Sequence, residues 1–216
     1  MAKKLESLAE IAEFKIVNMI IAGHLKLGSR VTEAELAEKL SISTAPVHQA
    51  LQALNRLGVV IIKPRKGTYI FTFTKEDICK MTLARYAIES EALRQAHVNS
   101  STRFSLELSR VISKMEESVR QGDLTGYLKY DAEFHDVFYK YSENEFLVMA
   151  SSAITIKVMV LWYLSILDKY TVGDMLLSFG DHQAIYEKVV VGEIDQACKI
   201  LSLHLKRLED IFSREE

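Results

Sequence analysis

Residues that interrupt regular structure are scarce in this chain. Its 216 residues include only 9 Gly and 2 Pro, a composition that favours long helices. The 2 Cys, Cys79 and Cys198, lack the spacing of a cysteine metal site, and so few thiols favour a cytoplasmic protein over a disulfide-stapled secreted one. The longest apolar run, near residues 158–164, is far shorter than the roughly 20 residues of a membrane span, so no membrane partner is expected.

Charged residues are present but unevenly distributed. With 49% hydrophobic and 26% charged residues, the composition is that of a soluble globular protein. The formal net charge is −2, yet residues 1–75 contain 11 Lys and Arg against 6 Asp and Glu, whereas the rest of the chain is acidic. A basic front and an acidic back indicate two domains, of which the first suits a polyanionic partner.

The first third of the chain combines helical patterns with two β-branched runs. Helices are predicted over 8–22, 32–40 and 44–57, and strands over 59–62 and 68–72. Thr32 and Glu35 have the spacing of a capping box, and Pro46 stands in a first helical turn, where a missing N–H is harmless. This order predicts a winged helix-turn-helix of three helices plus a β-hairpin.

Strand signals disappear after Lys75. Helices are predicted over 75–98, 102–121, 123–141, 143–168, 173–191 and 193–212. Their short connections imply an all-α antiparallel helical bundle. The fold class is therefore mainly α, with a winged helix-turn-helix domain over 1–74 and a helical domain over 75–216.

The third predicted helix and the hairpin carry side chains that suit DNA. In such a motif the second helix of the pair enters the major groove, and the wing lies along a phosphate backbone or in the minor groove. The candidate DNA-binding residues are Thr44, His48, Gln49, Lys63, Arg65, Lys66 and Gly67. Hydroxyl and basic groups bind phosphates, and glutamine pairs with adenine. The alternative is a protein-interaction module, which the basic charge of this domain disfavours.

Polar residues stand on the apolar stripes of three bundle helices. Asp131 and His135 are i,i+4 neighbours on one stripe, and His182 and His204 each lie on another. A carboxylate on such a stripe needs a partner, because its desolvation is costly. Three imidazoles and a carboxylate suit Zn²⁺, Ni²⁺, Mn²⁺ or Fe²⁺. The alternative is that each residue is a hydrogen-bonded core side chain. Arg85 and Glu89, also at i,i+4, are predicted to form a surface pair.

The segment 20–70 resembles the DNA-binding domain of the GntR family of transcriptional regulators. The family signature reads I-x-x-G-x-L-x-P-G, E-x-x-L-A-x-x-L-x-V-S-R-x-P-V-R-E-A-L, L-x-x-x-G-L-V and R-x-G. This chain matches it at Ile20-Ile21-Ala22-Gly23, Leu27-Gly28, Leu36-Ala37-Glu38-Lys39-Leu40, Ser43, Pro46-Val47, Ala50-Leu51, Leu57-Gly58-Val59-Val60 and Arg65-Lys66-Gly67.

The recognition helix departs from that signature. Thr44 and His48 replace the two arginines, and Gln49 replaces the glutamate. In the family those arginines contact operator phosphates and guanine. The family's usual operator is therefore not expected for this chain, although the fold is.

The remainder is similar to the all-helical FCD effector domain of the FadR subfamily. Its marks are an Arg in the first helix, D-x-x-F-H in the middle and two later His. Here they are Arg85, Asp131-Ala132-Glu133-Phe134-His135, His182 and His204. The resemblance implies a homodimer in which Asp131, His135, His182 and His204 bind a divalent metal ion (Zn, Ni or Mn). That ion would help to hold a small organic acid effector, with Arg85 as an effector-binding residue.

The resulting prediction is a cytoplasmic, ligand-responsive regulator that binds double-stranded operator DNA and is not an enzyme. Two alternatives stay open. Three His and one Asp with open metal positions could activate water in a metal-dependent hydrolase. A metal-stabilised interaction module that has lost DNA binding is the other alternative, and the missing arginines give it some weight.

Overall fold

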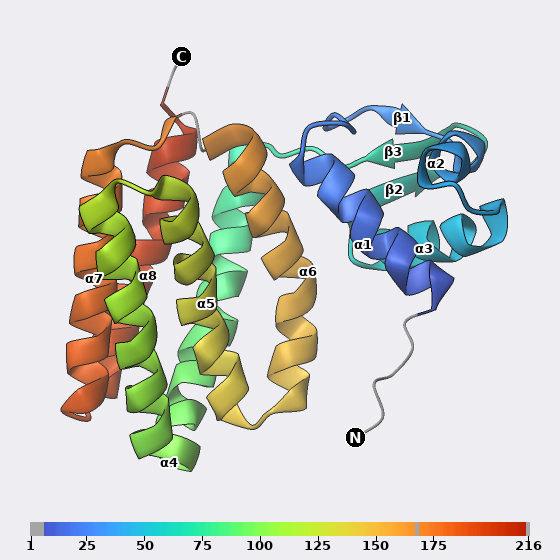
Figure 1. Cartoon of the computed structure of the whole chain (residues 1–216). Helices are drawn as coiled ribbons and strands as arrows, with labels where there is room; N and C mark the ends of the chain where they lie inside the picture. The colour runs from blue at the N-terminus through green and yellow to red at the C-terminus, as the bar shows by residue number, and fades with distance from the viewer. Residues whose placement is uncertain (1–6, 167–168, 215–216) are drawn as a thin grey trace. The chain divides into compact units, whose positions relative to one another are not determined.

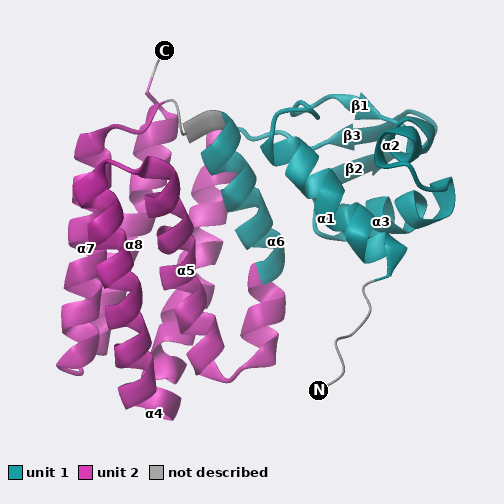
Figure 2. Cartoon of the chain, viewed as in Figure 1, with its two compact units in different colours: residues 1–74, 152–167 teal, residues 75–151, 168–216 magenta. Residues whose placement is uncertain are grey.

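A computed structural model describes residues 7–166 and 169–214, which are mainly helical (Figure 1). Contacts divide the chain into two compact units (Figure 2). Residues 1–74 and 152–167 form the first, here called the winged unit, and residues 75–151 and 168–216 form the second, the helical unit. The predicted fold class, a winged helix-turn-helix followed by a helical bundle, is confirmed. The domain limits 1–74 and 75–216 stay a prediction.

The winged unit begins with three helices and three strands. These are α1 (Leu8–Ile21), β1 (Arg30–Val31), α2 (Glu33–Leu40), α3 (Thr44–Arg56), β2 (Val60–Lys63) and β3 (Gly67–Ile70). The predicted capping box begins α2: Glu35 N donates to Thr32 Oγ1 at 3.2 Å, and Thr32 N donates to the Glu35 carboxylate at 3.1 Å. Two backbone N–H groups that the first helical turn leaves without intrahelical partners are thereby bonded.

The sheet has one strand more than the sequence predicts. Its order is β1-β3-β2, antiparallel throughout, with Arg30 of β1 and Ile61 of β2 both opposite Tyr69. A strand of two residues shows no periodicity, so β1 could not be predicted from the sequence pattern. Gly28 lies in the turn before β1 and has φ +74, a backbone conformation that favours glycine. A Cβ at this position would lie 3.1 Å from Thr72 Cγ2.

An apolar core joins α1, α2, α3 and the strands. Its fully buried members include Ala12, Ile16, Ile20, Leu36, Val47, Leu51, Leu54, Val60 and Ile70, together with Val160 of α6 (Glu145–Leu161). Burial of this apolar surface stabilises the unit and fixes α3, whose opposite side is left exposed.

The helical unit consists of long helices that lie alongside one another (Figure 2). They are α4 (Lys75–Gln121), α5 (Leu124–Ser142), α7 (Val172–Val190) and α8 (Ile194–Phe212), with the start of α6. The predicted helix over 143–168 is α-helical only to Leu161 and continues as a π-helical turn, Trp162–Ile166. Its predicted last residues, 167 and 168, lie outside the described residues.

A corner at Ser100 divides α4 into two arms, 75–99 and 101–121. Ser100 has non-helical angles, φ −147 and ψ 35, inside the break that the sequence predicts at 99–101. Asn99 Nδ2 donates to the carbonyl of Ser142 at 2.7 Å, and Ser100 Oγ donates to Glu143 at 3.1 Å. The corner therefore supplies a partner for a carbonyl at the C-terminus of α5.

One stretch of the described chain, Glu145–Leu164, is long and apolar enough to cross a membrane by length and composition, with 22% of it buried. This stretch is longer than the apolar run over 158–164, because it also contains polar residues such as Ser151 and Lys157. The core helix of a soluble protein has the same length and composition.

Candidate metal centre and nucleic-acid surface

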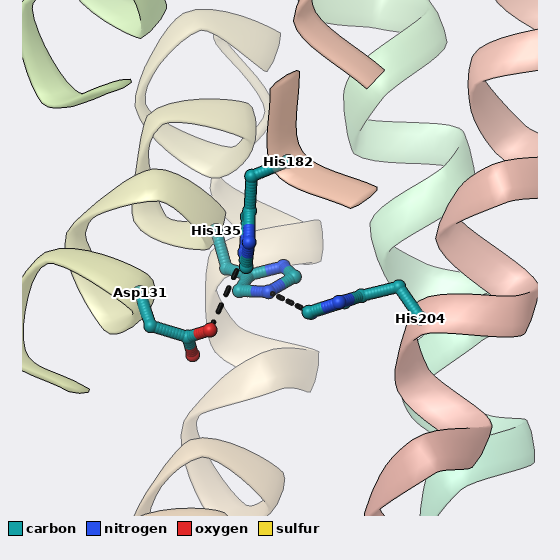
Figure 3. A group of neighbouring side chains, drawn as sticks. All are labelled: Asp131, His135, His182 and His204. Atoms are coloured by element: carbon teal, nitrogen blue, oxygen red, sulfur yellow. Dashed lines mark hydrogen bonds and ion pairs between the residues drawn. The ribbon is translucent and has the colours of Figure 1, made fainter. Parts of the chain in front are cut away.

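Four buried side chains of the helical unit converge on one point. Asp131 and His135 project from α5, His182 from α7 and His204 from α8 (Figure 3). One ligand atom from each residue lies within 4.8 Å of the other three. All four residues of the predicted metal-binding set are thus brought together.

The spacing of the ligand atoms suits a first-row divalent ion. His182 Nε2 lies 3.3 Å from Asp131 Oδ1, and the Nε2 atoms of His135 and His204 are 3.2 Å apart. Metal–nitrogen bonds of about 2.0–2.1 Å in a tetrahedral site separate neighbouring ligand atoms by about 3.3 Å. These two contacts have that separation, and the four ligand atoms together lie within 4.8 Å of one another.

The outer nitrogen of His135 is held by Glu89 of α4. His135 Nδ1 lies 2.7 Å from Glu89 Oε2, and both side chains are buried. Burial alone would raise the pKa of Glu89, but the Arg85 guanidinium and His135 outweigh it and hold that pKa at about 2. An ionised carboxylate only accepts hydrogen bonds, so it keeps the His135 proton on Nδ1 and leaves the Nε2 lone pair for a cation.

His182 is oriented in the same way by its own helix. Its Nδ1 donates to the carbonyl of Ser178 at 2.7 Å, while its Nε2 is buried without a hydrogen-bond partner among the described residues. Burial, together with His204 and His135, lowers the pKa of His182 well below its usual value. A neutral imidazole with an unpartnered inward lone pair is the form that a metal ion requires.

The Nε2 atom of His204 faces the centre, and its Nδ1 atom faces the carboxylate of Asp181. Its Nδ1 lies 3.6 Å from Asp181 Oδ2, an ion-pair distance longer than a hydrogen bond. Arg207 Nε in turn donates to Asp181. Burial is the main cause that lowers the pKa of His204, so this imidazole too is held neutral. Each of the three His thus has an oxygen acceptor near its outer nitrogen, as His side chains that bind metal ions commonly do.

Glu89 is the functional residue that sequence reasoning misses. The prediction of an Arg85–Glu89 surface pair is wrong: the side chains are 12% and 2% exposed, and Arg85 Nε donates to Glu89 Oε1. The i,i+4 spacing places two residues together but does not say which way they face. Glu89 shares its helix face with buried Ala92, Leu93 and Ala96, and that apolar stripe was the available signal.

The predicted DNA-binding residues lie in two places in the winged unit. Thr44, His48 and Gln49 are exposed on α3. Lys63, Arg65 and Lys66 are exposed at the turn between β2 and β3, where Gly67 begins β3 with φ +118. An exposed helix face and a basic wing meet the steric requirement of a winged helix-turn-helix that contacts DNA.

The comparisons with known families fit both units. Residues 8–70 match the family described as "Bacterial regulatory proteins, gntR family", and residues 80–207, more than half of the chain, match the FCD domain. The chain belongs to the GntR family, with an FCD domain. Both matches are to regulators of transcription and not to enzymes, as the sequence predicts.

Individual GntR relatives extend the likeness over nearly the whole chain. HTH-type transcriptional regulator LutR of Bacillus subtilis is 28% identical over 217 residues, which cover 90% of this chain and 96% of LutR. The probable D-xylose utilization operon transcriptional repressor of Paenarthrobacter nicotinovorans is 29% identical over 153 residues. These residues cover 71% of this chain and 67% of the repressor. The structure of E. coli McbR/YncC has a TM-score of 0.77 at 18% identity, covering 96% and 98% of the two chains, and so shares the fold.

Proposed function

We propose that this GntR/FCD protein is a cytoplasmic, homodimeric regulator that binds operator DNA and responds to a small organic acid held at a metal centre. The four buried ligand atoms within 4.8 Å of one another carry the proposal. Membership of a family of DNA-binding transcriptional regulators supports the DNA partner and the dimer.

The proposed ligands of the ion are Asp131, His135, His182 and His204. One carboxylate and three imidazoles suit Zn, Ni or Mn, which share these donor types and differ in preferred geometry. The alternative, a core of mutually satisfied polar residues, leaves the buried Nε2 of His182 without a hydrogen-bond partner in the described chain. An unsatisfied buried polar atom is costly, whereas a cation bound there removes the cost.

The proposed effector is a small carboxylate that the metal ion binds and Arg85 orients. A guanidinium carries five N–H donors in a planar fork that matches a carboxylate, and the contact with Glu89 uses one of them. Burial by itself would lower the pKa of Arg85, but the carboxylates of Glu89 and Asp131 outweigh it and raise that pKa, so the guanidinium stays charged beside the metal ligands.

The proposed DNA contacts divide into groove and backbone. Exposed Thr44, His48 and Gln49 on α3 would face base edges and nearby phosphates in the major groove, and the wing residues Lys63, Arg65, Lys66 and Gly67 would lie on the backbone. In this arrangement the wing supplies sequence-independent affinity, and the helix supplies sequence preference.

The test combines metal analysis with DNA binding. We expect purified protein to contain about one divalent ion per chain and to bind the DNA upstream of its own gene in an electrophoretic assay. We expect removal of the ion by a chelator to alter this binding and metal addition to restore it. If the purified protein binds DNA but contains no metal, the protein is a regulator without a metal centre. If it contains metal but does not bind DNA, the interaction-module alternative is favoured.

A further inference from the structure

His48 lies on α3, the helix proposed to enter the major groove, and it has an acidic partner that is not among the proposed DNA contacts. His48 Nδ1 of α3 lies 2.7 Å from Glu33 Oε1 in the first turn of α2. The two side chains are 54% and 44% exposed, and neither residue belongs to the apolar core of the unit. A carboxylate on a DNA-binding surface repels phosphates, so Glu33 by its charge alone would weaken DNA binding. This raises the question of what else Glu33 does there.

The contact fixes the position of the imidazole proton. An ionised carboxylate has no hydrogen to donate, so the hydrogen of this bond is on His48 Nδ1. In a neutral imidazole the other nitrogen, Nε2, then carries a lone pair and acts only as an acceptor. Glu33 thereby sets which hydrogen-bonding character His48 presents outward.

Only two bases offer a donor to such an acceptor in the major groove. Adenine presents its N6 amino group there and cytosine its N4 amino group, whereas guanine and thymine present acceptors at the corresponding atoms. Arginine, which only donates, has the opposite requirement and suits guanine.

We propose that Glu33 is a positioning residue that makes His48 an acceptor, so that the protein selects adenine or cytosine where His48 meets the DNA. This inference rests on the proposed function, in which α3 enters the major groove. It assigns Glu33, a residue outside the predicted DNA-binding set, a part in sequence selection. It also gives His48 a stated base preference.

Selection of the full-length protein against a randomised duplex library tests the proposal. The experiment is done at pH 8, where an ordinary imidazole is neutral. Binding constants are then measured for duplexes that carry each of the four bases at every selected position. We expect one position per half-site to prefer adenine or cytosine by about fivefold to tenfold, the lower range for base discrimination.

Two variants identify that position and its cause. His48→Ala should reduce the preference there to about twofold or less, with the other positions unchanged. Glu33→Gln should reduce it at the same position, because an amide can donate to Nδ1 and so release the opposite tautomer. Glu38→Gln, an exposed acid elsewhere on α2, removes the same charge and should leave the preference intact.

The outcomes separate this inference from the proposed function. A preference for guanine or thymine at the position that depends on His48 overturns the acceptor assignment. An effect of His48→Ala that Glu33→Gln does not reproduce reduces the pair to a surface ion pair of little consequence. Base preferences that neither variant changes overturn the inference but leave DNA binding intact. A chain that selects no DNA overturns both.

Discussion

The two units present their proposed functional side chains in opposite ways. In the winged unit these side chains are exposed, lie on α3 and the wing, and take little part in the core. In the helical unit they are buried, come from α4, α5, α7 and α8, and contact one another. A DNA surface can therefore change by substitution without disturbing the fold, whereas the buried centre is part of the packing that holds the helices together.

The largest effect is expected when one metal ligand of the buried centre is removed. His135→Ala deletes an Nε2 atom at the centre, and we expect the metal content to fall from about one ion per chain to almost none. Elemental analysis after gel filtration measures it. His24→Ala, which removes an exposed His of the winged unit, is the matched control. Full metal occupancy in the His135 variant would falsify the ligand assignment.

The buried pair Arg85–Glu89 on α4 should contribute far more to the free energy of unfolding than an exposed pair does. Glu89→Ala leaves the Arg85 charge buried and unpaired, and such losses cost about 3–5 kcal/mol in the free energy of unfolding. Glu76 pairs with Lys80 on the same helix at the same i,i+4 spacing, but these side chains are 75% and 71% exposed. Glu76→Ala should change stability far less. Urea unfolding of metal-free protein at pH 7 compares the two, and equal losses would contradict the assigned burial.

The same carboxylate predicts a dependence of stability on pH. The pKa of Glu89 is about 2 in the folded chain against an ordinary value of 4.5. Because the folded value is the lower one, the ionised group stabilises the fold above pH 4.5, and this contribution is lost as the pH falls towards 2. Its size is about 3 kcal/mol. In metal-free Glu89→Gln we expect a shallower decline of unfolding free energy across that window. Parallel curves for the two proteins would contradict the pairing.

Loss of a wing charge should affect DNA affinity and leave stability unchanged. Lys66→Ala removes one proposed phosphate contact per chain and two per dimer, so the slope of log affinity against log salt should become shallower by about 1.8. All DNA sequences should be weakened alike, with an unchanged melting temperature. Lys199→Ala, at an exposed lysine on α8, is the control. A change confined to one sequence would show that Lys66 reads bases.

The smallest expected effect is a gain. Thr44→Arg places a guanidinium on the exposed face of α3 and should steepen the salt dependence by about 0.9 for each phosphate contact formed. Fluorescence anisotropy with a fixed duplex over a salt series measures the slope. If the arginine changes neither affinity nor slope, Thr44 does not face DNA.

Much of the fold could be predicted from local patterns. The Thr32–Glu35 cap, the break at Ser100 and the hairpin all follow from residues close together in the chain. The metal set was also predictable, because inward polar residues stand out against apolar stripes. Strand β1 was not, since two residues carry no period and their pairing with β3 depends on a distant segment.

The amino-acid sequence places one carboxylate and three imidazoles at inward helical positions, and Thr44, His48 and Gln49 on the exposed face of α3. The partners that these side chains contact depend on the tertiary fold. It buried Glu89 against His135, 46 residues away, and set Glu33 against His48, 15 residues away. Helical periodicity gives the face on which a residue lies, but which helix packs against that face depends on the summed burial of the whole core.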